Sequence, residues 1–145
     1  REGLANALTD RMLDEACRWK QRWDRSGHRL KLSVNVSAAA LADPSAADRY
    51  QAIAESHDIE PEEIILEITE SSVMSDAARG LGLLARLRLN GFGLSIDDFG
   101  TGYSSLAQLS QIPFTELKID RSFTEDLSKA PEHQAKIREI AARAP

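Results

Sequence analysis

Two adjacent aspartates, Asp97 and Asp98, follow the strand-like stretch Leu94-Ser95-Ile96 and precede the glycine-punctuated segment Phe99-Gly100-Thr101-Gly102-Tyr103-Ser104-Ser105. An apolar run that ends in such a loop is how a parallel strand carries functional groups to its carboxyl end. Two neighbouring carboxylates repel each other and are costly to ionise beside an apolar sheet unless a positive charge lies between them. A divalent cation would supply that charge. On this stretch alone, an alternative stays open in which Asp98 only holds the turn and Asp97 is solvated.

Three further segments are typical of strands and carry polar side chains toward their ends. They are residues 30–36 with Asn35, residues 64–70 with Glu67, and residues 116–120 with Lys118 and Asp120 on one face. The charge of Glu67 within an apolar run is informative, because a buried Glu is rare unless it is paired or bound to metal. For Asn35, a structural role in closing a turn is the competing interpretation.

Helical patterns precede and separate these strands. They cover residues 4–25, 38–56 with a break near 43–45, 71–90, 103–112, 121–128 and 132–143. Alternation of strand and helix predicts an α/β fold with a parallel sheet and right-handed crossovers. In the first helix, apolar residues recur at steps of three and four, from Leu4 and Leu8 to Trp19 and Trp23. We expect this stripe to be buried, with both tryptophans as core anchors rather than a stacking platform.

If the strands are parallel, their polar ends converge on one rim, as in a barrel whose active site lies at the carboxyl ends of its strands. Asn, Glu and Asp side chains are hard oxygen donors, which suit magnesium or manganese better than zinc or copper. Asp97 and Asp98 can both reach such a site only if the backbone is already turning, because adjacent strand residues point to opposite faces. Two ions could then support a phosphoryl displacement. Lys118 could neutralise the phosphate or orient the attacking water, or could form only a salt bridge with Asp120 or Glu67.

The composition limits the class of protein. The chain has 145 residues, of which 42% are hydrophobic and 28% charged, so it can bury one core. Its net charge of -5 argues against binding to nucleic acid or an anionic membrane surface. There is no apolar run of the roughly 18 residues that a membrane span requires and no signal-peptide pattern. Cys17 is the only cysteine, so there is no disulfide framework and the cytoplasm is the expected location. The three histidines lack the spacing of a zinc site.

Three known motifs resemble parts of this sequence, but the sequence does not match any of them in full. Asp98-Phe99-Gly100 resembles the metal-binding tripeptide of kinases, but no His-Arg-Asp loop or glycine-rich strand precedes it. Gly100-Thr101-Gly102 lacks the third glycine of a dinucleotide-binding fingerprint. A phosphorelay receiver would carry its phosphoacceptor on a separate strand between the aspartate pair and the lysine. In this sequence Lys118 follows the aspartate pair before any such strand.

Four motifs together resemble the EAL-domain phosphodiesterases, which hydrolyse the bacterial messenger cyclic di-GMP to the linear dinucleotide pGpG. They are Ser33-Val34-Asn35-Val36-Ser37, Leu66-Glu67-Ile68-Thr69-Glu70-Ser71, Asp97-Asp98-Phe99-Gly100-Thr101-Gly102-Tyr103-Ser104-Ser105-Leu106 and Leu117-Lys118-Ile119-Asp120. The match spans roughly residues 10 to 130 in the family's order and spacing. It implies a (β/α)8 TIM-type barrel, two magnesium or manganese ions, cytoplasmic signalling, and regulatory sensory domains in the parent protein.

The resemblance also implies roles for single residues. Asn35, Glu67, Asp97 and Asp98 correspond to metal ligands, and Lys118 to the lysine near the attacking water; Lys118, Glu67 and Asp97 are thus the expected catalytic residues. Asp120 lies beside that site in the family pattern. Glu70 corresponds to the glutamate that steadies the loop over residues 99–105, which in this family links metal binding to dimer contacts and activity. The expected partners are cyclic di-GMP and a second copy in a homodimer.

Several parts of the family pattern lie outside this sequence. The Glu-Ala-Leu signature would precede Arg1, and the later strands that carry another glutamate and a glutamine would follow Pro145. We therefore expect residues 1–145 to be a partial EAL domain, roughly the second to fifth strands of the barrel with their helices, and to be inactive alone. A non-catalytic receptor that binds cyclic di-GMP is the alternative for the parent protein.

Overall fold

A computed structural model of the chain describes residues 2–75, 77–99, 111–121, 134–135 and 138. Its elements, in chain order, are α1 (Glu2–Arg25), β1 (Leu32–Asn35), α2 (Ala38–Leu41), α3 (Ala46–Ser56), the 3-10 turn η1 (Pro61–Glu63), β2 (Ile64–Thr69), α4 (Glu70–Ser75), α5 (Ala77–Leu89), β3 (Gly93–Phe99) and β4 (Glu116–Ile119). The predicted helices over residues 103–112, 121–128 and 132–143 lie largely outside the described residues.

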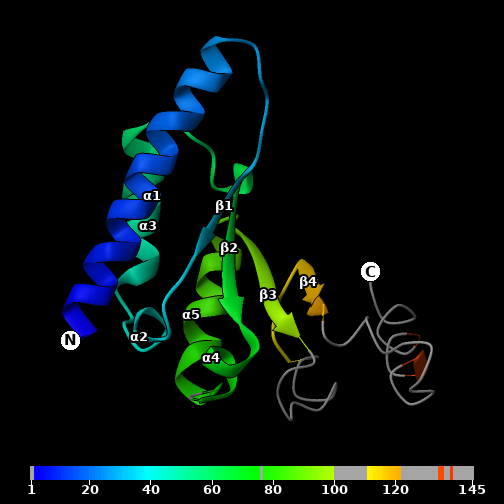
Figure 1. Cartoon of the computed structure of the whole chain (residues 1–145). Coiled ribbons are helices and arrows are strands. Elements are labelled where there is room, and N and C mark those ends of the chain that lie inside the picture. The colour runs from blue at the N-terminus through cyan, green and yellow to red at the C-terminus, as the bar shows by residue number, and fades with distance from the viewer. Residues whose placement is uncertain (1, 76, 100–110, 122–133, 136–137, 139–145) are drawn as a thin grey trace.

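The strands form one parallel sheet in the order β1-β2-β3-β4 (Figure 1). Each strand pairs with the next one along the chain, with helices in the crossovers between β1, β2 and β3. This is the connectivity of consecutive units in a (β/α)8 barrel. The predicted fold class, a part of a TIM-type barrel, is therefore confirmed.

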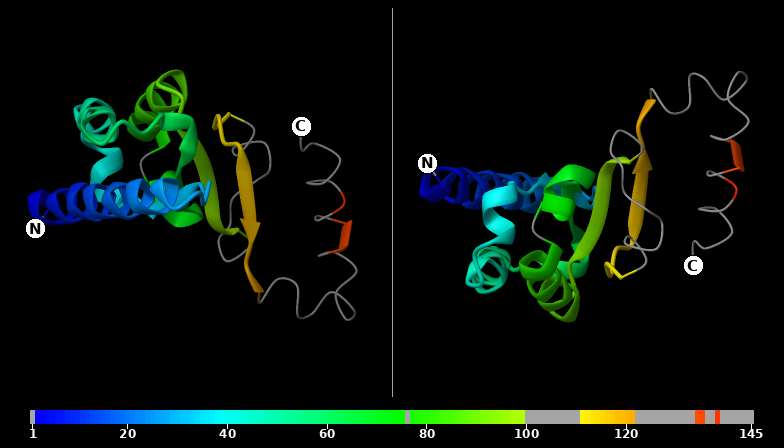
Figure 2. Two further views of the ribbon diagram at one scale, coloured as in Figure 1. Left: turned by 90° about the horizontal axis from the view of Figure 1, so that it is seen from above. Right: turned by 90° about the horizontal axis from the view of Figure 1, so that it is seen from below.

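One face of the sheet is apolar and covered by helices. Figures 1 and 2 show α1, α3 and α5 gathered on the same side of the strands. The strand residues that point to this side are buried, as expected from a period of two: Leu32, Val34, Leu66, Ile68, Leu94 and Ile96. Ser33, Asn35, Glu67 and Asp97 alternate with them along the strands. The opposite face of the sheet therefore carries the polar side chains.

Short-range chemistry explains where the helices begin and end. Ser37 caps α2 because its hydroxyl oxygen accepts a hydrogen bond from the backbone N–H of Ala40 at 3.3 Å. The predicted break near residues 43–45 is confirmed, and there Asp43 Oδ1 accepts hydrogen bonds from the backbone N–H and the hydroxyl of Ser45 at 2.9 and 2.7 Å. After α5 the chain turns at Gly91, whose φ of 101° favours glycine.

A buried lysine ties α1 to the start of β2. Lys20 is 0% exposed, and its ammonium lies 3.0 Å from Asp24 Oδ2 and 2.8 Å from Glu63 Oε1. Two carboxylates around one buried ammonium compensate the loss of water that burial imposes on the charge. The α1 helix is thereby fixed against η1.

The prediction of a buried stripe along the first helix was wrong for most of its residues. Leu4, Leu8, Met12 and Trp19 are 78%, 60%, 43% and 50% exposed. The buried face of α1 is instead centred on Thr9, Leu13, Cys17 and Lys20. The cause is geometric, because α1 packs on β1, α2 and α3 with the adjacent face of the helix. Of the two tryptophans, Trp23 packs against the core, whereas Trp19 carries the Arg22 guanidinium 4.8 Å from its ring centre.

In the part of the chain that the structure describes, no helix combines the length and the hydrophobicity needed for a membrane crossing.

Two leucines of α5 test which side of this helix supports the fold. Both belong to its apolar sequence pattern, but Leu84 is 0% exposed and Leu89 is 87% exposed. We expect Leu84→Ala to lower the free energy of unfolding by about 2–5 kcal/mol, because it leaves a cavity in the core. Leu89→Ala, the matched control, should change it by less than about 0.5 kcal/mol. Urea denaturation measures both, and equal losses would contradict this placement of α5.

Candidate active site

The predicted site residues lie at one edge of the sheet because the strands are parallel. Asn35 on β1 is the register partner of Glu67 on β2, and Asp97 on β3 is the partner of Thr69, two residues beyond Glu67. Residues two apart in a strand share a face, so Asn35, Glu67 and Asp97 are on the same face near the carboxyl ends of three neighbouring strands. The structure thus confirms that these strand ends converge.

Glu67 is the centre of this polar face. Its side chain is only 10% exposed, and its carboxylate accepts hydrogen bonds from the Lys118 ammonium and the Ser33 hydroxyl, both at Oε1. Lys118 reaches Glu67 from β4, across β3. The salt bridge with Glu67, which was one of the interpretations considered for Lys118, is therefore formed.

Burial and hydrogen bonding act in opposite directions on these two groups. Burial, the largest single influence, raises the pKa of Glu67, but the hydrogen bonds from Lys118 and Ser33 and the charge of Lys118 outweigh it, so the pKa is lowered. The hydrogen bond to Glu67 raises the pKa of Lys118 against a smaller effect of burial, and the charges of Glu67, Asp97 and Glu116 raise it further. Both groups are consequently charged at neutral pH.

A bulge in β3 lies at the two adjacent aspartates, whose side chains would point to opposite faces in a regular strand. Ile96 pairs with Leu117 and Phe99 with Ile119, so two residues of β3, Asp97 and Asp98, lie opposite the single residue Lys118. Asp98 has a φ of 56°, in the left-handed region that Asp tolerates better than most residues, and its N–H donates to Asp97 Oδ1 at 2.9 Å. The backbone therefore turns at the pair, as the sequence required for both carboxylates to serve one site.

The two remaining predicted residues lie next to this edge. Glu70 begins α4 directly after β2 and is 1% exposed. Residues 100–105 of the loop that it was expected to steady lie outside the described residues. Asp120 follows β4, and its backbone N–H donates to the carbonyl oxygen of Phe99 at 3.0 Å, which ties the end of β4 to the bulged strand.

Two serines belong to the same face and were not singled out as site residues from the sequence. Ser33 donates to Glu67, and the buried Ser95 donates to Glu116 Oε1 at 3.0 Å. The period of two could have indicated them, because Ser33 is two residues before Asn35 and Ser95 is two residues before Asp97. A hydrogen bond between side chains on different strands, however, depends on register, which the sequence alone does not give.

The donor types at this edge fit a hard divalent cation. One amide and three carboxylates, from Asn35, Glu67, Asp97 and Asp98, are the oxygen ligands that magnesium and manganese prefer. Within the described ranges, no three His, Cys, Asp or Glu side chains lie close enough together to form a metal-binding group by themselves. Lys118 supplies the cation that compensates Glu67 in this arrangement.

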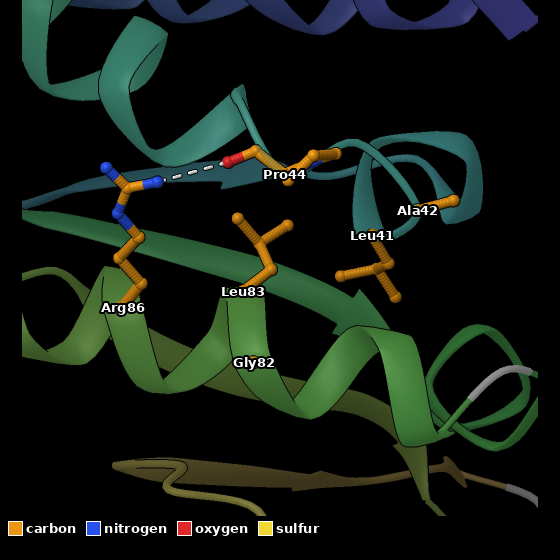
Figure 3. Close-up of a pocket in the computed structure, with 6 residues that line it drawn as sticks. All are labelled: Leu41, Ala42, Pro44, Gly82, Leu83 and Arg86. Carbon is orange, nitrogen blue, oxygen red and sulfur yellow. Dashed lines mark hydrogen bonds between the residues drawn. The ribbon is translucent and has the colours of Figure 1, made fainter.

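A hollow on the helical side of the molecule lies apart from these residues. It is lined by Leu41, Ala42, Pro44, Gly82, Leu83 and Arg86, between α2 and α5 (Figure 3). Arg86 closes one end by donating to the carbonyl oxygen of Pro44 at 3.3 Å. None of the predicted site residues lines this hollow, so it carries none of the chemistry discussed above.

Comparison with known proteins identifies the family model that fits the chain. The model described as "EAL domain" matches residues 1–144. The bifunctional diguanylate cyclase/cyclic di-GMP phosphodiesterase MucR of Pseudomonas aeruginosa is 42% identical over 97% of this chain and 21% of its own length. The cyclic di-GMP phosphodiesterase PA2567 of the same organism is 37% identical over 91% of this chain and 22% of its own length. The chain therefore spans about a fifth of these relatives.

A solved structure is similar over nearly the whole chain. The structure described as "PaMucR Phosphodiesterase, c-di-GMP complex" has 42% sequence identity and a TM-score of 0.83, and the match covers 97% of this chain and 57% of that one.

The backbone of Asp98 provides a test of the bulge. At a φ of 56° a residue with an ordinary β-carbon costs about 1–2 kcal/mol, whereas Gly and, to a lesser degree, Asn adopt this conformation readily. We expect Asp98→Ala to lower the free energy of unfolding relative to Asp98→Gly by roughly 1 kcal/mol, with Asp98→Asn between them. Urea denaturation of the three variants measures the difference. Equal stability of the Ala and Gly variants would mean that the bulge is absent.

The pair of Glu67 and Lys118 predicts a pH dependence. The pKa of Glu67 is lowered from 4.5, so its stabilisation is present above pH 4.5 and is lost as the pH falls through the lower folded value. The pKa of Lys118 is raised from 10.5, so its contribution is present below pH 10.5 and is lost as the pH rises further.

Lys118→Met should therefore lower the melting temperature at pH 7, because it leaves a nearly buried carboxylate without its cation. The difference from the unchanged protein should shrink as the pH falls, because protonation of Glu67 removes the unpaired charge of the variant and, at lower pH, the ion pair of the unchanged protein. Circular dichroism melts between pH 3 and 9 measure this, with Arg86→Met, which breaks an exposed ion pair with Asp48, as the control. A difference that stays constant over this range would contradict the pairing.

Proposed function

This chain belongs to the EAL domain family, and from that premise we propose that it forms part of a metal-dependent phosphodiesterase that hydrolyses cyclic di-GMP to linear pGpG. The observation that carries the proposal is the edge of the sheet where Asn35, Glu67, Asp97 and Lys118 come from four consecutive parallel strands. Relatives named as cyclic di-GMP phosphodiesterases, and a similar structure described as a c-di-GMP complex, support the same substrate.

We propose that Asn35, Glu67, Asp97 and Asp98 hold the metal, which is magnesium or manganese, with two ions in the intact domain. When bound, such ions would polarise a phosphate and lower the pKa of a nearby water. The bulge at Asp97 and Asp98 supports this role, because it interrupts the alternation that sends successive side chains of a strand to opposite faces. Without such a role, the left-handed backbone of Asp98 would lower stability and serve no function.

Lys118 acts in this proposal as a fixed positive charge. Its raised pKa keeps the ammonium protonated at neutral pH, so it donates hydrogen bonds and does not accept the proton of water. It can orient the attacking water or neutralise the phosphate as negative charge develops there. In the hydrolysis the water oxygen forms a bond to phosphorus, one ester bond breaks, and the departing ribose oxygen takes up a proton.

We infer that residues 1–145 are one part of an EAL domain whose remaining strands complete the barrel. The share of the similar structure that the chain covers, 57%, supports this. Within the intact cytoplasmic protein, Glu70 would steady the loop after the aspartate pair and Asp120 would lie beside the site. Homodimerisation through that domain and control by sensory domains complete the proposal.

A cyclic di-GMP receptor without catalytic activity is the second candidate. It is favoured by the lack, within the described ranges, of three acidic, His or Cys side chains close enough to hold a metal by themselves. Such a receptor would bind the nucleotide at the same edge and would not need the bulged aspartates.

The protein in its full natural length should convert cyclic di-GMP to pGpG in the presence of magnesium or manganese, and a chelator should abolish the conversion. Glu67→Gln and Asp97→Asn should each lower kcat roughly hundredfold or more, because metal polarisation is worth several kcal/mol and about 1.4 kcal/mol corresponds to tenfold in rate. Chromatographic detection of pGpG measures this.

Asp48→Asn is the matched control. It also neutralises one carboxylate, but this one is exposed on α3 and forms an ion pair with Arg86, so the rate should stay unchanged. Binding of cyclic di-GMP without product, and without any effect of the chelator, would favour the receptor instead.

A further inference from the structure

The carboxylate of Glu67 has two donors of different character. Lys118 brings a charge on a long side chain that is 40% exposed, whereas Ser33 brings a neutral hydroxyl one bond from the β-carbon of a paired strand residue. A long side chain follows its partner at little cost in energy. A serine on a hydrogen-bonded strand has few orientations, so its hydroxyl defines a direction in space.

The register explains how Ser33 reaches Glu67 at all. The strand partner of Glu67 is Asn35, and the strand partner of Ser33 is Ile65. Ser33 and Asn35 are two apart and share a face, so the hydroxyl contacts Glu67 from the diagonal position, one step below the expected metal ligand of β1. Ser33 thus lies below the site and supports a residue within it.

Both hydrogen bonds that the described residues give to this carboxylate end on the same oxygen, Oε1. The bond from Ser33 fixes the rotation of the carboxylate group, and this rotation decides where Oε2 points. Residues that hold a metal ligand through a hydrogen bond commonly set metal affinity although they do not touch the ion. The contact of Ser33 with Glu67 is of this supporting type.

A second Ser–Glu pair on the same face provides a comparison. Ser95 donates to Glu116 Oε1 at 3.0 Å, from β3 to β4, and Ser95 is the register partner of both Glu67 and Glu116. The two serines make the same type of bond between neighbouring strands. Only Ser33 makes it to a residue in the expected metal set.

We propose that Ser33 is a positioning residue that orients the Glu67 carboxylate toward the metal, an inference that rests on the proposed function. Removal of its hydroxyl leaves the metal ligands in place but lets Glu67 rotate. The consequence is weaker metal binding before any chemistry takes place.

The test uses Mn²⁺ itself as the probe, titrated without nucleotide into the protein in its full natural length and followed by electron paramagnetic resonance of the free ion. Ser33→Ala should raise the Mn²⁺ dissociation constant about tenfold, the lower end of the range for such supporting residues. Ser33→Thr, which keeps the hydroxyl on a residue that strands favour, should restore the affinity to within about twofold. Ser95→Ala, which removes the matched bond to Glu116, should leave it unchanged.

The hydrolysis assay separates the failure of this inference from that of the proposed function. An active protein whose Ser33→Ala variant is folded and binds Mn²⁺ as tightly as before would overturn the role of Ser33 alone. Mn²⁺ binding that depends on Ser33, in a protein that produces no pGpG, would support the role of Ser33 and overturn the phosphodiesterase. If the unchanged protein bound no Mn²⁺, both would be overturned.

Discussion

The carboxylate of Glu67 lies within an apolar strand and needs a positive charge close to it. Lys118 supplies this charge from β4, although β3 lies between the two strands. Two strand spacings amount to about 10 Å, a distance that the long Lys118 side chain closes. On β3 the register partner of Glu67 is the small residue Ser95, whereas Lys118 on β4 lies opposite the bulged pair Asp97 and Asp98. The ion pair therefore runs diagonally across the polar face of the sheet.

The aspartate pair shows a second constraint, the strict alternation of side chains along a strand. In a regular strand Asp97 and Asp98 would point to opposite faces, and one of them would enter the apolar layer under the helices. The bulge opposite Lys118 adds one residue to β3. The left-handed conformation falls on Asp98, and Asp tolerates it better than most residues other than glycine. The pair then lies at the carboxyl end of the strand, beside the lysine whose pKa reflects the charge of Asp97.

Alternation and parallel topology made most of the fold and the strand ends predictable from the sequence. The four strands, the break after α2 and the convergence of Asn35, Glu67 and Asp97 all follow from patterns within one segment or from the direction of the strands. The choice of Glu67 as partner of Lys118, the contact of Ser33 and the bulge depend on the register between strands, which no single segment encodes. The prediction of which face of α1 is buried failed for a related reason. The sequence shows that a stripe of the helix is apolar, but it does not show which side of the helix the rest of the fold will cover.

The two faces of the sheet have different roles: the apolar face stabilises the fold, and the polar face carries the candidate site residues. Leu66 and Ile68 enter the helical side, whereas Glu67 between them enters the polar side, so one short strand serves both. Charges on the polar face reduce stability unless they are paired. The apolar layer on the other face can offset this loss of stability, because its packing does not involve the charged side chains. A residue such as Ser33 can therefore be selected for the direction in which it holds a carboxylate rather than for its contribution to folding. The same separation lets a barrel change the residues at its rim while the helices that support the sheet remain unchanged.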